Sequence, residues 1–179
     1  GGEHVHFGNH VYANFGLTLV DDTHIYVGDN TMFGPHVTVA TAGHPIDPTL
    51  RAKEYQYNMA VHIGKNCWIG KNFVCNGNGR VDIADNCDIG PEVTFQTGGH
   101  EIGDAERRAG KGRKFCQSVG RGTWIGGRVT ILGETSIGNA CVVAGCACVV
   151  KDVGDNMLVG GVPARSIRNL ECIEKTVTE

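Results

Sequence analysis

The sequence predicts an all-β solenoid, on three observations. A six-residue pattern of aliphatic, Gly, variable, Asn and small residues recurs, as in residues 63–67 followed by 69–73. A short fixed period is typical of solenoids, in which each repeat buries its apolar face only against its neighbours. The chain has 27 glycines, and aromatic residues make up only 7% of it, so a narrow core of small aliphatic side chains is favoured.

The period of six differs from the 3.6 of a helix and fits short strands separated by tight turns, each strand pointing one aliphatic side chain inward. Gly or Asn after each strand permits positive φ at the corners. The pattern is present at residues 27–31, 63–73 and 83–93, and continues over 125–141. It ends near Val150.

Two long segments interrupt the hexads, at about residues 41–60 and 98–118. The first contains Gly43-His44-Pro45 and the second contains Gly98-Gly99-His100. Each is followed by a return to hexads that includes a Trp-Ile-Gly sequence, at 68–70 and 124–126. Long loops in a regular solenoid are usually functional. We therefore expect two protruding loops that carry the site.

The C-terminal part leaves the hexad pattern. Residues 161–165 read Gly-Val-Pro-Ala-Arg and lead into residues 166–174, which we predict to form a short helix capping the open end. The expected organisation is one β-helical domain over residues 1–165 and a C-terminal cap and tail over 166–179.

Composition excludes several classes of function. The formal net charge is −3, with 16 basic and 19 acidic residues and no basic stripe, so we expect no nucleic-acid partner. No apolar run approaches the roughly 18 residues of a membrane span, and we expect neither a membrane partner nor a secretory leader.

The chain has 8 cysteines and no CxxC pair. Cys67, Cys87, Cys141 and Cys148 fall where a small inward residue belongs, and there cysteine acts as a small hydrophobe. We therefore predict a packing role rather than metal or redox chemistry. Many free thiols indicate a reducing, cytoplasmic location.

In combination, the hexads, the Gly-His loops, the returning Trp-Ile-Gly and the terminal Gly-Val-Pro-Ala-Arg resemble the left-handed parallel β-helix (hexapeptide-repeat) acetyltransferases. Residues 12–45 are similar to maltose and galactoside O-acetyltransferases in particular, and residues 94–111 to other sugar O-acetyltransferases of the superfamily. The resemblance implies an acetyl-CoA-dependent O-acetyltransferase acting on a sugar or similar small hydroxyl acceptor. It also implies a homotrimer with sites between neighbouring subunits.

Three features depart from that family. We expect the chain to lack the helical N-terminal segment of the maltose and galactoside enzymes. Gly16 stands where those enzymes usually have Asn, and there are two histidine loops instead of one. We interpret the chain as either a duplication or an engineered splice, with a seam near residues 68–70.

The resemblance assigns roles to two sets of residues. Asn14 and Asp22 have the family's spacing to His44 and form the acceptor half. His100 has the family's spacing to the coenzyme A half, which comprises Ala144, Lys151, Arg165 and Arg168.

Acetyl transfer to an alcohol needs a general base, and histidine suits this task because it titrates near neutrality. A neighbouring Gly can leave backbone N–H groups free for the oxyanion. We expect His100 rather than His44 to be the base, because the pantetheine arm has finite reach. For either histidine, the alternative is a loop residue bonded to a carbonyl.

For each candidate binding residue there is also an interpretation that involves no ligand. Asn14 and Asp22 can bond sugar hydroxyls or serve turns. Trp124 can wall the pantetheine channel or pack under a loop. Lys151, Arg165 and Arg168 can bind phosphates or remain solvated. The basic run in residues 107–114 can guide an anionic substrate or lie in solvent.

Two other classes of function remain open. One is a catalytically silent β-helix scaffold. The other is a metal-dependent, carbonic-anhydrase-like enzyme, which needs three convergent histidines. His4, His6 and His10 are not an obvious set of that kind, and we expect no metal site.

Overall fold

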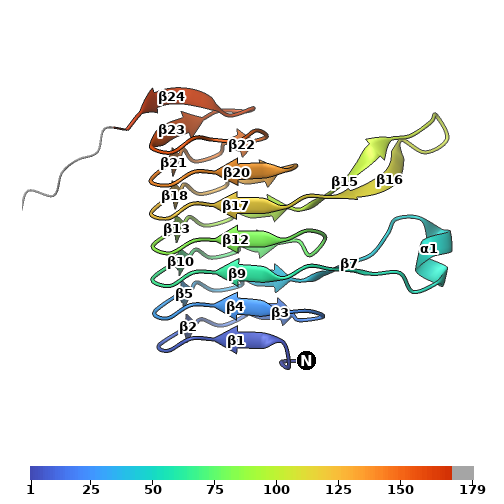
Figure 1. The fold of residues 1–179 in the computed structure, drawn as a ribbon, viewed down its shortest axis with the longest axis horizontal. Coiled ribbons are helices and arrows are strands. Elements are labelled where there is room, and N and C mark those ends of the chain that lie inside the picture. The colour runs from blue at the N-terminus through green and yellow to red at the C-terminus, as the bar shows by residue number, and fades with distance from the viewer. Residues whose placement is uncertain (171–179) are drawn as a thin grey trace, which may run out of the picture.

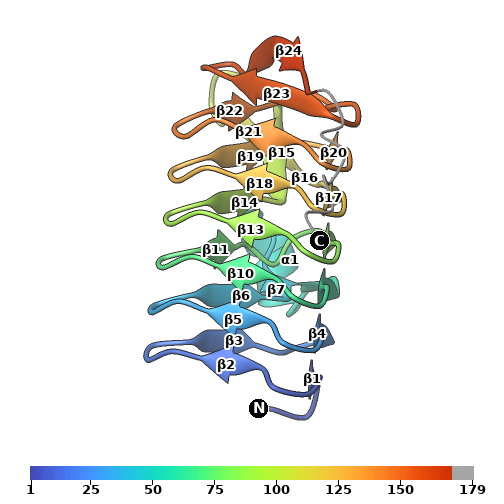
Figure 2. The same ribbon diagram turned by 90° about the vertical axis from the view of Figure 1, so that its left-hand side faces the viewer.

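The computed structural model describes residues 1–170, which wind into a left-handed prism of stacked coils with two projections on one side (Figure 1). Each regular coil contributes one short strand to each of three parallel sheets. The coils stack in chain order from the N-terminus to the C-terminal end, as the view turned by 90° shows (Figure 2). The predicted fold class is therefore confirmed.

Three sheets form the faces. Sheet A contains β1 (Val5–Phe7), β4 (Ile25–Val27), β9 (Val61–Ile63), β12 (Val81–Ile83), β17 (Gln117–Val119) and β20 (Thr135–Ile137). Sheet B contains β2 (Tyr12–Ala13), β5 (Met32–Phe33), β10 (Trp68–Ile69), β13 (Asp88–Ile89), β18 (Trp124–Ile125), β21 (Val142–Val143), β23 (Met157–Gly160) and β24 (Arg165–Asn169). Sheet C contains β3 (Thr18–Val20), β6 (Thr38–Ala40), β11 (Val74–Cys75), β14 (Thr94–Gln96), β19 (Thr130–Leu132) and β22 (Cys148–Val149).

The core is a narrow column of aligned side chains. In sheet B, Phe33, Ile69, Ile89 and Ile125 occupy one register position and are at most 1% exposed. Since side chains alternate along a strand, the residue before each of these points outward. The hexad period thus sets which side chains fill the prism, as predicted, although the core also takes the aromatic ring of Phe33.

Asparagines form ladders along one corner. Asn30, Asn66 and Asn86 have φ between 55° and 59°, which Asn tolerates better than most residues. Their amides bond from coil to coil, Asn30 to Asn66 at 3.2 Å and Asn66 to Asn86 at 3.0 Å. The recurring Asn of the hexad therefore makes the corner and also links successive coils.

Most of the cysteine prediction holds. Cys67, Cys87 and Cys141 are buried, and so is Cys75. Cys148 was predicted to point inward, and this is wrong: it is half-buried, while its neighbours Ala147 and Val149 fill the core.

The predicted C-terminal helix is also wrong where the structure describes it. Residues 165–169 form β24, which pairs antiparallel with β23. The edge of sheet B offers unpaired backbone groups, and the chain turns back after Pro163 to pair with them. Residues 171–174 of the predicted helix lie outside the described residues.

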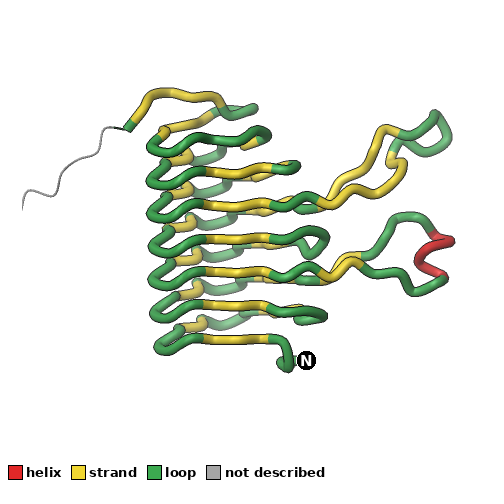
Figure 3. The backbone as a smooth tube through the Cα atoms, viewed as in Figure 1, coloured by secondary structure: helices red, strands yellow, loops and turns green. Residues whose placement is uncertain are grey.

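Two hairpins interrupt the coils, where the loops were predicted (Figure 3). The first pairs β7 (Ala42–Gly43) with β8 (Tyr57–Asn58) and carries the short helix α1 (Pro48–Ala52). Asp47 caps this helix by accepting from the Thr49 N–H, and Pro48 opens it. The second pairs β15 (Gly98–Ile102) with β16 (Ala109–Lys114).

Candidate active site

Both hairpins leave the prism at the corner where sheet C passes into sheet A. The first lies between β6 and β9, and the second between β14 and β17. One coil, which contributes β12, separates them in the stack. At about 4.8 Å per coil, their bases are roughly 10 Å apart, and they project side by side (Figure 1).

His100 lies on β15 with its side chain exposed. Its Nδ1 atom is 3.1 Å from the carbonyl oxygen of Gly110 on β16. A carbonyl only accepts hydrogen bonds, so Nδ1 carries the proton and the neutral ring keeps an unprotonated Nε2. His100 is thus a loop residue bonded to a carbonyl, which was the alternative to a catalytic role. The same bond also fixes the tautomer that a general base requires.

His44 is exposed as well, between the buried residues Gly43 and Pro45. Within residues 1–170, no hydrogen bond orients its ring. The structure thus gives the two histidines different environments: His100 is held by its own hairpin and His44 is not.

One glycine close to each histidine has a packing role that the sequence did not reveal. A Cβ atom on Gly43 would lie 1.6 Å from Oδ1 of Asn78, and one on Gly98 would lie 1.9 Å from Nδ2 of the same residue. Asn78 belongs to the short turn between β11 and β12 on the intervening coil. It packs against the base of both hairpins.

The acceptor candidates lie at different corners of the prism. Asn14 is half-buried between sheets B and C, and its Oδ1 accepts from the Phe15 N–H at 2.8 Å. Asp22 lies between sheets C and A and accepts from Nε2 of Gln56, on the first hairpin. The structure therefore brings Asp22, but not Asn14, to the corner that carries the hairpins.

The coenzyme candidates lie on the last coils. Trp124 is 56% exposed on sheet B and shares one column with Val142, Leu158 and Arg168. Its exposure contradicts the alternative that it packs under a loop. Ala144 is half-buried at the corner between sheets B and C, and Lys151 is exposed at the hairpin corner. Arg165 is exposed, and its guanidinium donates to the Ala164 carbonyl at 2.9 Å.

A cleft of about 440 Å³ lies between the hairpins. Its size falls in the range of about 300–1,000 Å³ that is usual for small-molecule sites. Pro45, Ile46, Asp47, Leu50 and Tyr57 line it from the first hairpin, and Gly103, Asp104, Arg107, Ala109, Gly110, Lys111 and Gly112 from the second.

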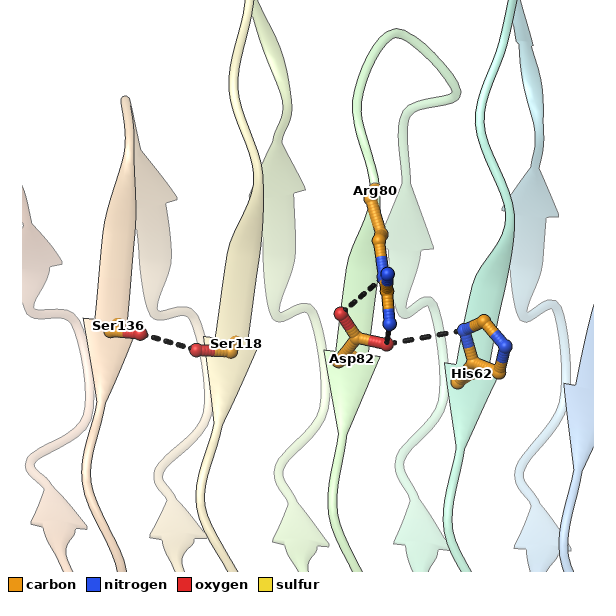
Figure 4. Close-up of polar contacts among 5 residues, drawn as sticks. All are labelled: His62, Arg80, Asp82, Ser118 and Ser136. Carbon is orange, nitrogen blue, oxygen red and sulfur yellow. Dashed lines mark hydrogen bonds and ion pairs between the residues drawn. The ribbon is translucent and has the colours of Figure 1, made fainter.

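A wider hollow of about 840 Å³ lies along sheet A. There Tyr26 stacks between His6 and His62, with ring centroids 4.7 and 4.8 Å away. Oδ1 of Asp82 lies 3.1 Å from Nδ1 of His62 without forming a hydrogen bond, and Oδ2 pairs with Nε of Arg80 at 2.7 Å (Figure 4). Asp82 thus lies between His62 and Arg80, and within residues 1–170 no nucleophile is bonded to it.

Farther along the same face, the hydroxyls of Ser118 and Ser136 bond to each other (Figure 4). The histidine stack therefore does not assemble a nucleophile–base pair. Among residues 1–170, no three His, Cys, Asp or Glu side chains are placed to hold a metal ion. No helix of the described part is long and apolar enough to cross a membrane.

Comparison with known proteins gives partial sequence matches and a fold match over most of the chain. No family model matches. The galactoside O-acetyltransferase of Lactococcus lactis is 55% identical over 100 residues, which cover 48% of this chain and 48% of that protein. The galactoside O-acetyltransferase of Escherichia coli is 43% identical over 89 residues, covering 50% and 43%. The chain thus spans about half the length of these curated relatives.

A solved hexapeptide-repeat acetyltransferase from Vibrio cholerae, in complex with acetyl coenzyme A, superimposes with a TM-score of 0.59 at 26% identity. The match covers 88% of this chain and 72% of that one.

Proposed function

We propose, from the chain's place among the left-handed β-helix (hexapeptide-repeat) acetyltransferases, that it transfers the acetyl group of acetyl-CoA to a hydroxyl of a sugar. The observation that carries this proposal is the 55% identity over 100 residues to a galactoside O-acetyltransferase. The fold shared with an acetyltransferase that binds acetyl coenzyme A supports the donor.

In the proposed reaction, the unprotonated Nε2 of His100 takes the proton of the acceptor hydroxyl. The hydroxyl oxygen attacks the thioester carbon and forms a C–O bond. When the tetrahedral intermediate collapses, the C–S bond breaks and the coenzyme thiolate takes the proton back from the imidazolium. The Gly110 carbonyl accepts from Nδ1 and so stabilises the imidazolium formed midway.

The coenzyme is proposed to contact the last coils. Lys151, Arg165 and Arg168 are exposed and can make charge-assisted bonds to its phosphates. Trp124 and Ala144 are proposed to line the path of its pantetheine arm. On the acceptor side, Asp22 and Asn14 are proposed to bind hydroxyls, and their separation at two corners supports a site completed by a second subunit.

We propose a homotrimer for the same reason. The outer column of sheet B exposes Tyr12, Met32, Trp68 and Trp124 by 45–56%. Asp88 interrupts this column between the two tryptophans, and such a mostly apolar surface typically marks an interface. Light scattering at micromolar concentration should give the mass of three chains, and a monomer would remove the intersubunit site.

The free thiols of the described residues support a reducing, cytoplasmic setting.

The activity is tested by release of the coenzyme thiol from acetyl-CoA with a panel of neutral and acidic sugars. Sugar-dependent release, together with an acetylated product seen by mass spectrometry, is expected. No release with any sugar would favour the scaffold alternative. The metal-dependent alternative is tested by metal analysis of the purified protein together with the same assay in the presence of a chelator.

A further inference from the structure

The cleft between the two hairpins has an uneven distribution of charge. The second hairpin, residues 98–114, contains five Arg and Lys against three Asp and Glu, while residues 42–58 contain two of each. Two of the cations, Arg107 and Lys111, line the cleft. The ion pairs of residues 1–170 involve the side chains of His62, Arg80 and Arg128 with carboxylates, so neither cleft cation has an ion-pair partner there.

The two acids of the cleft are engaged by backbone groups. Asp104 accepts from the N–H groups of Glu106 and Arg107 at 3.1 and 3.0 Å. Asp47 accepts from the Thr49 N–H at 2.7 Å. That bond is the main cause of the lowered pKa of Asp47, and the charge of Arg107 on the facing hairpin adds a smaller effect. Both carboxylates thus serve their own turns, whereas the two cations are free to meet a ligand.

Two residues that line the cleft are linked directly to the candidate bases. Gly110 lines it, and the carbonyl of the same residue holds Nδ1 of His100. Pro45 lines the opposite wall and directly follows His44. Ile46, Leu50 and Tyr57 add apolar surface and one hydroxyl, a combination that suits the faces and hydroxyls of a sugar ring.

From this arrangement we propose that the cleft binds an acidic sugar, with the anionic group of the acceptor held between Arg107 and Lys111. The inference rests on the proposed function for the transfer itself, and adds the chemical class of the acceptor. The shared chemistry is an anion on a sugar ring, either a carboxylate or a phosphate. Guanidinium and ammonium groups recognise both, and Arg can do so with two parallel bonds.

The experiment compares galactose, galacturonate and galactose 1-phosphate as acceptors with wild type, Arg107→Gln and Lys111→Gln. Lys114→Gln is the matched control, because Lys114 is exposed on the same hairpin and does not line the cleft. Thiol release gives kcat/KM for each pair. Calorimetry without acetyl-CoA gives the affinity for each sugar, and thermal melting shows that each variant folds.

The wild type should prefer one or both acidic sugars to galactose by tenfold or more. Each cleft variant should lose roughly tenfold of that preference, as expected for a charge-assisted bond, while Lys114→Gln keeps it. The control variant Lys114→Gln should also keep the wild-type activity with galactose. The carboxylate and phosphate arms show which anion is preferred.

Equal kcat/KM and equal affinity for galactose and both acidic sugars would overturn the inference and leave the proposed transferase activity intact. The inference would also fall if the cleft variants raised KM for acetyl-CoA without changing sugar preference, because the cations would then serve the coenzyme. Conversely, binding of an acidic sugar that depends on Arg107 and Lys111, without any acetyl transfer, would support the cleft and refute the transfer.

Discussion

Nδ1 of His100 lies 3.1 Å from the carbonyl oxygen of Gly110, ten residues further along the chain and on the opposite strand of the same hairpin. The bond joins the candidate base to a wall of the cleft. The residue whose carbonyl orients the imidazole is therefore also a residue that a ligand in the cleft would contact.

The first prediction compares the two histidines. His100→Ala should lower kcat by about 10²–10⁴ with little change in KM for acetyl-CoA, because a positioned base acts on the chemical step. His44→Ala should have a smaller effect, since no hydrogen bond within residues 1–170 orients its ring. Both variants are assayed in parallel with one acceptor.

A large loss for His44→Ala with none for His100→Ala would reverse this assignment and place the thioester beside the first hairpin. If neither variant loses activity, the base is another group and the proposed mechanism is wrong.

The second prediction concerns the coenzyme. Arg165→Ala should weaken acetyl-CoA binding by about tenfold or more if its guanidinium meets a phosphate, and added salt should weaken binding to the wild type. Isothermal calorimetry measures both. Arg121→Ala, an exposed arginine at another corner, is the control. Equal affinity of the Arg165→Ala variant and the wild type would remove this residue from the coenzyme site.

The coils could be predicted from the sequence because each hexad contains both residues that a coil needs. These are an inward aliphatic residue and a corner residue that tolerates positive φ. Ile69 and Asn66 illustrate both, and the structure places them as expected. The positions of the two hairpins could also be predicted from the sequence, because these are the two segments that interrupt the six-residue pattern.

What could not be predicted depends on contacts between distant segments. Residues 165–169 pair with β23 because the last edge of sheet B is open, and no local pattern encodes that edge. Asn78 contacts glycines 35 residues before it and 20 after it in the chain. The bond between His100 and Gly110 depends on the register of a hairpin whose turn has no standard signature.

The third prediction tests the role of Asn78. Gly43→Ala should destabilise the fold by about 1–3 kcal/mol, because the added Cβ would overlap the Asn78 side chain and overpacking typically costs that much. Asn78→Ala should relieve the overlap, so the double variant should be more stable than the sum of the single effects predicts. Denaturant unfolding of the four proteins measures the coupling. Strict additivity would mean that Gly43 is needed for another reason.

The last prediction uses the thiol of Cys75, which is 0% exposed in the core. Burial disfavours the thiolate and raises the pKa of this thiol from 9.0 to about 12. Between these values the unfolded chain loses the proton while the folded chain keeps it, so the unfolded state binds fewer protons and the free energy of unfolding falls as pH rises. The contribution of this thiol to the free energy of unfolding is unaffected below about pH 9 and declines by about 1.4 kcal/mol per pH unit above it.

Denaturant unfolding of wild type and Cys75→Ala at pH 8 and pH 10 should therefore show the wild type losing more stability than the variant between the two. Cys116→Ala, which changes an exposed thiol, should follow the wild type at both values. A wild type and Cys75→Ala variant that lose equal stability between pH 8 and pH 10 would show that this thiol ionises as readily in the fold as in the unfolded chain, and that coil stacking leaves its position open to water.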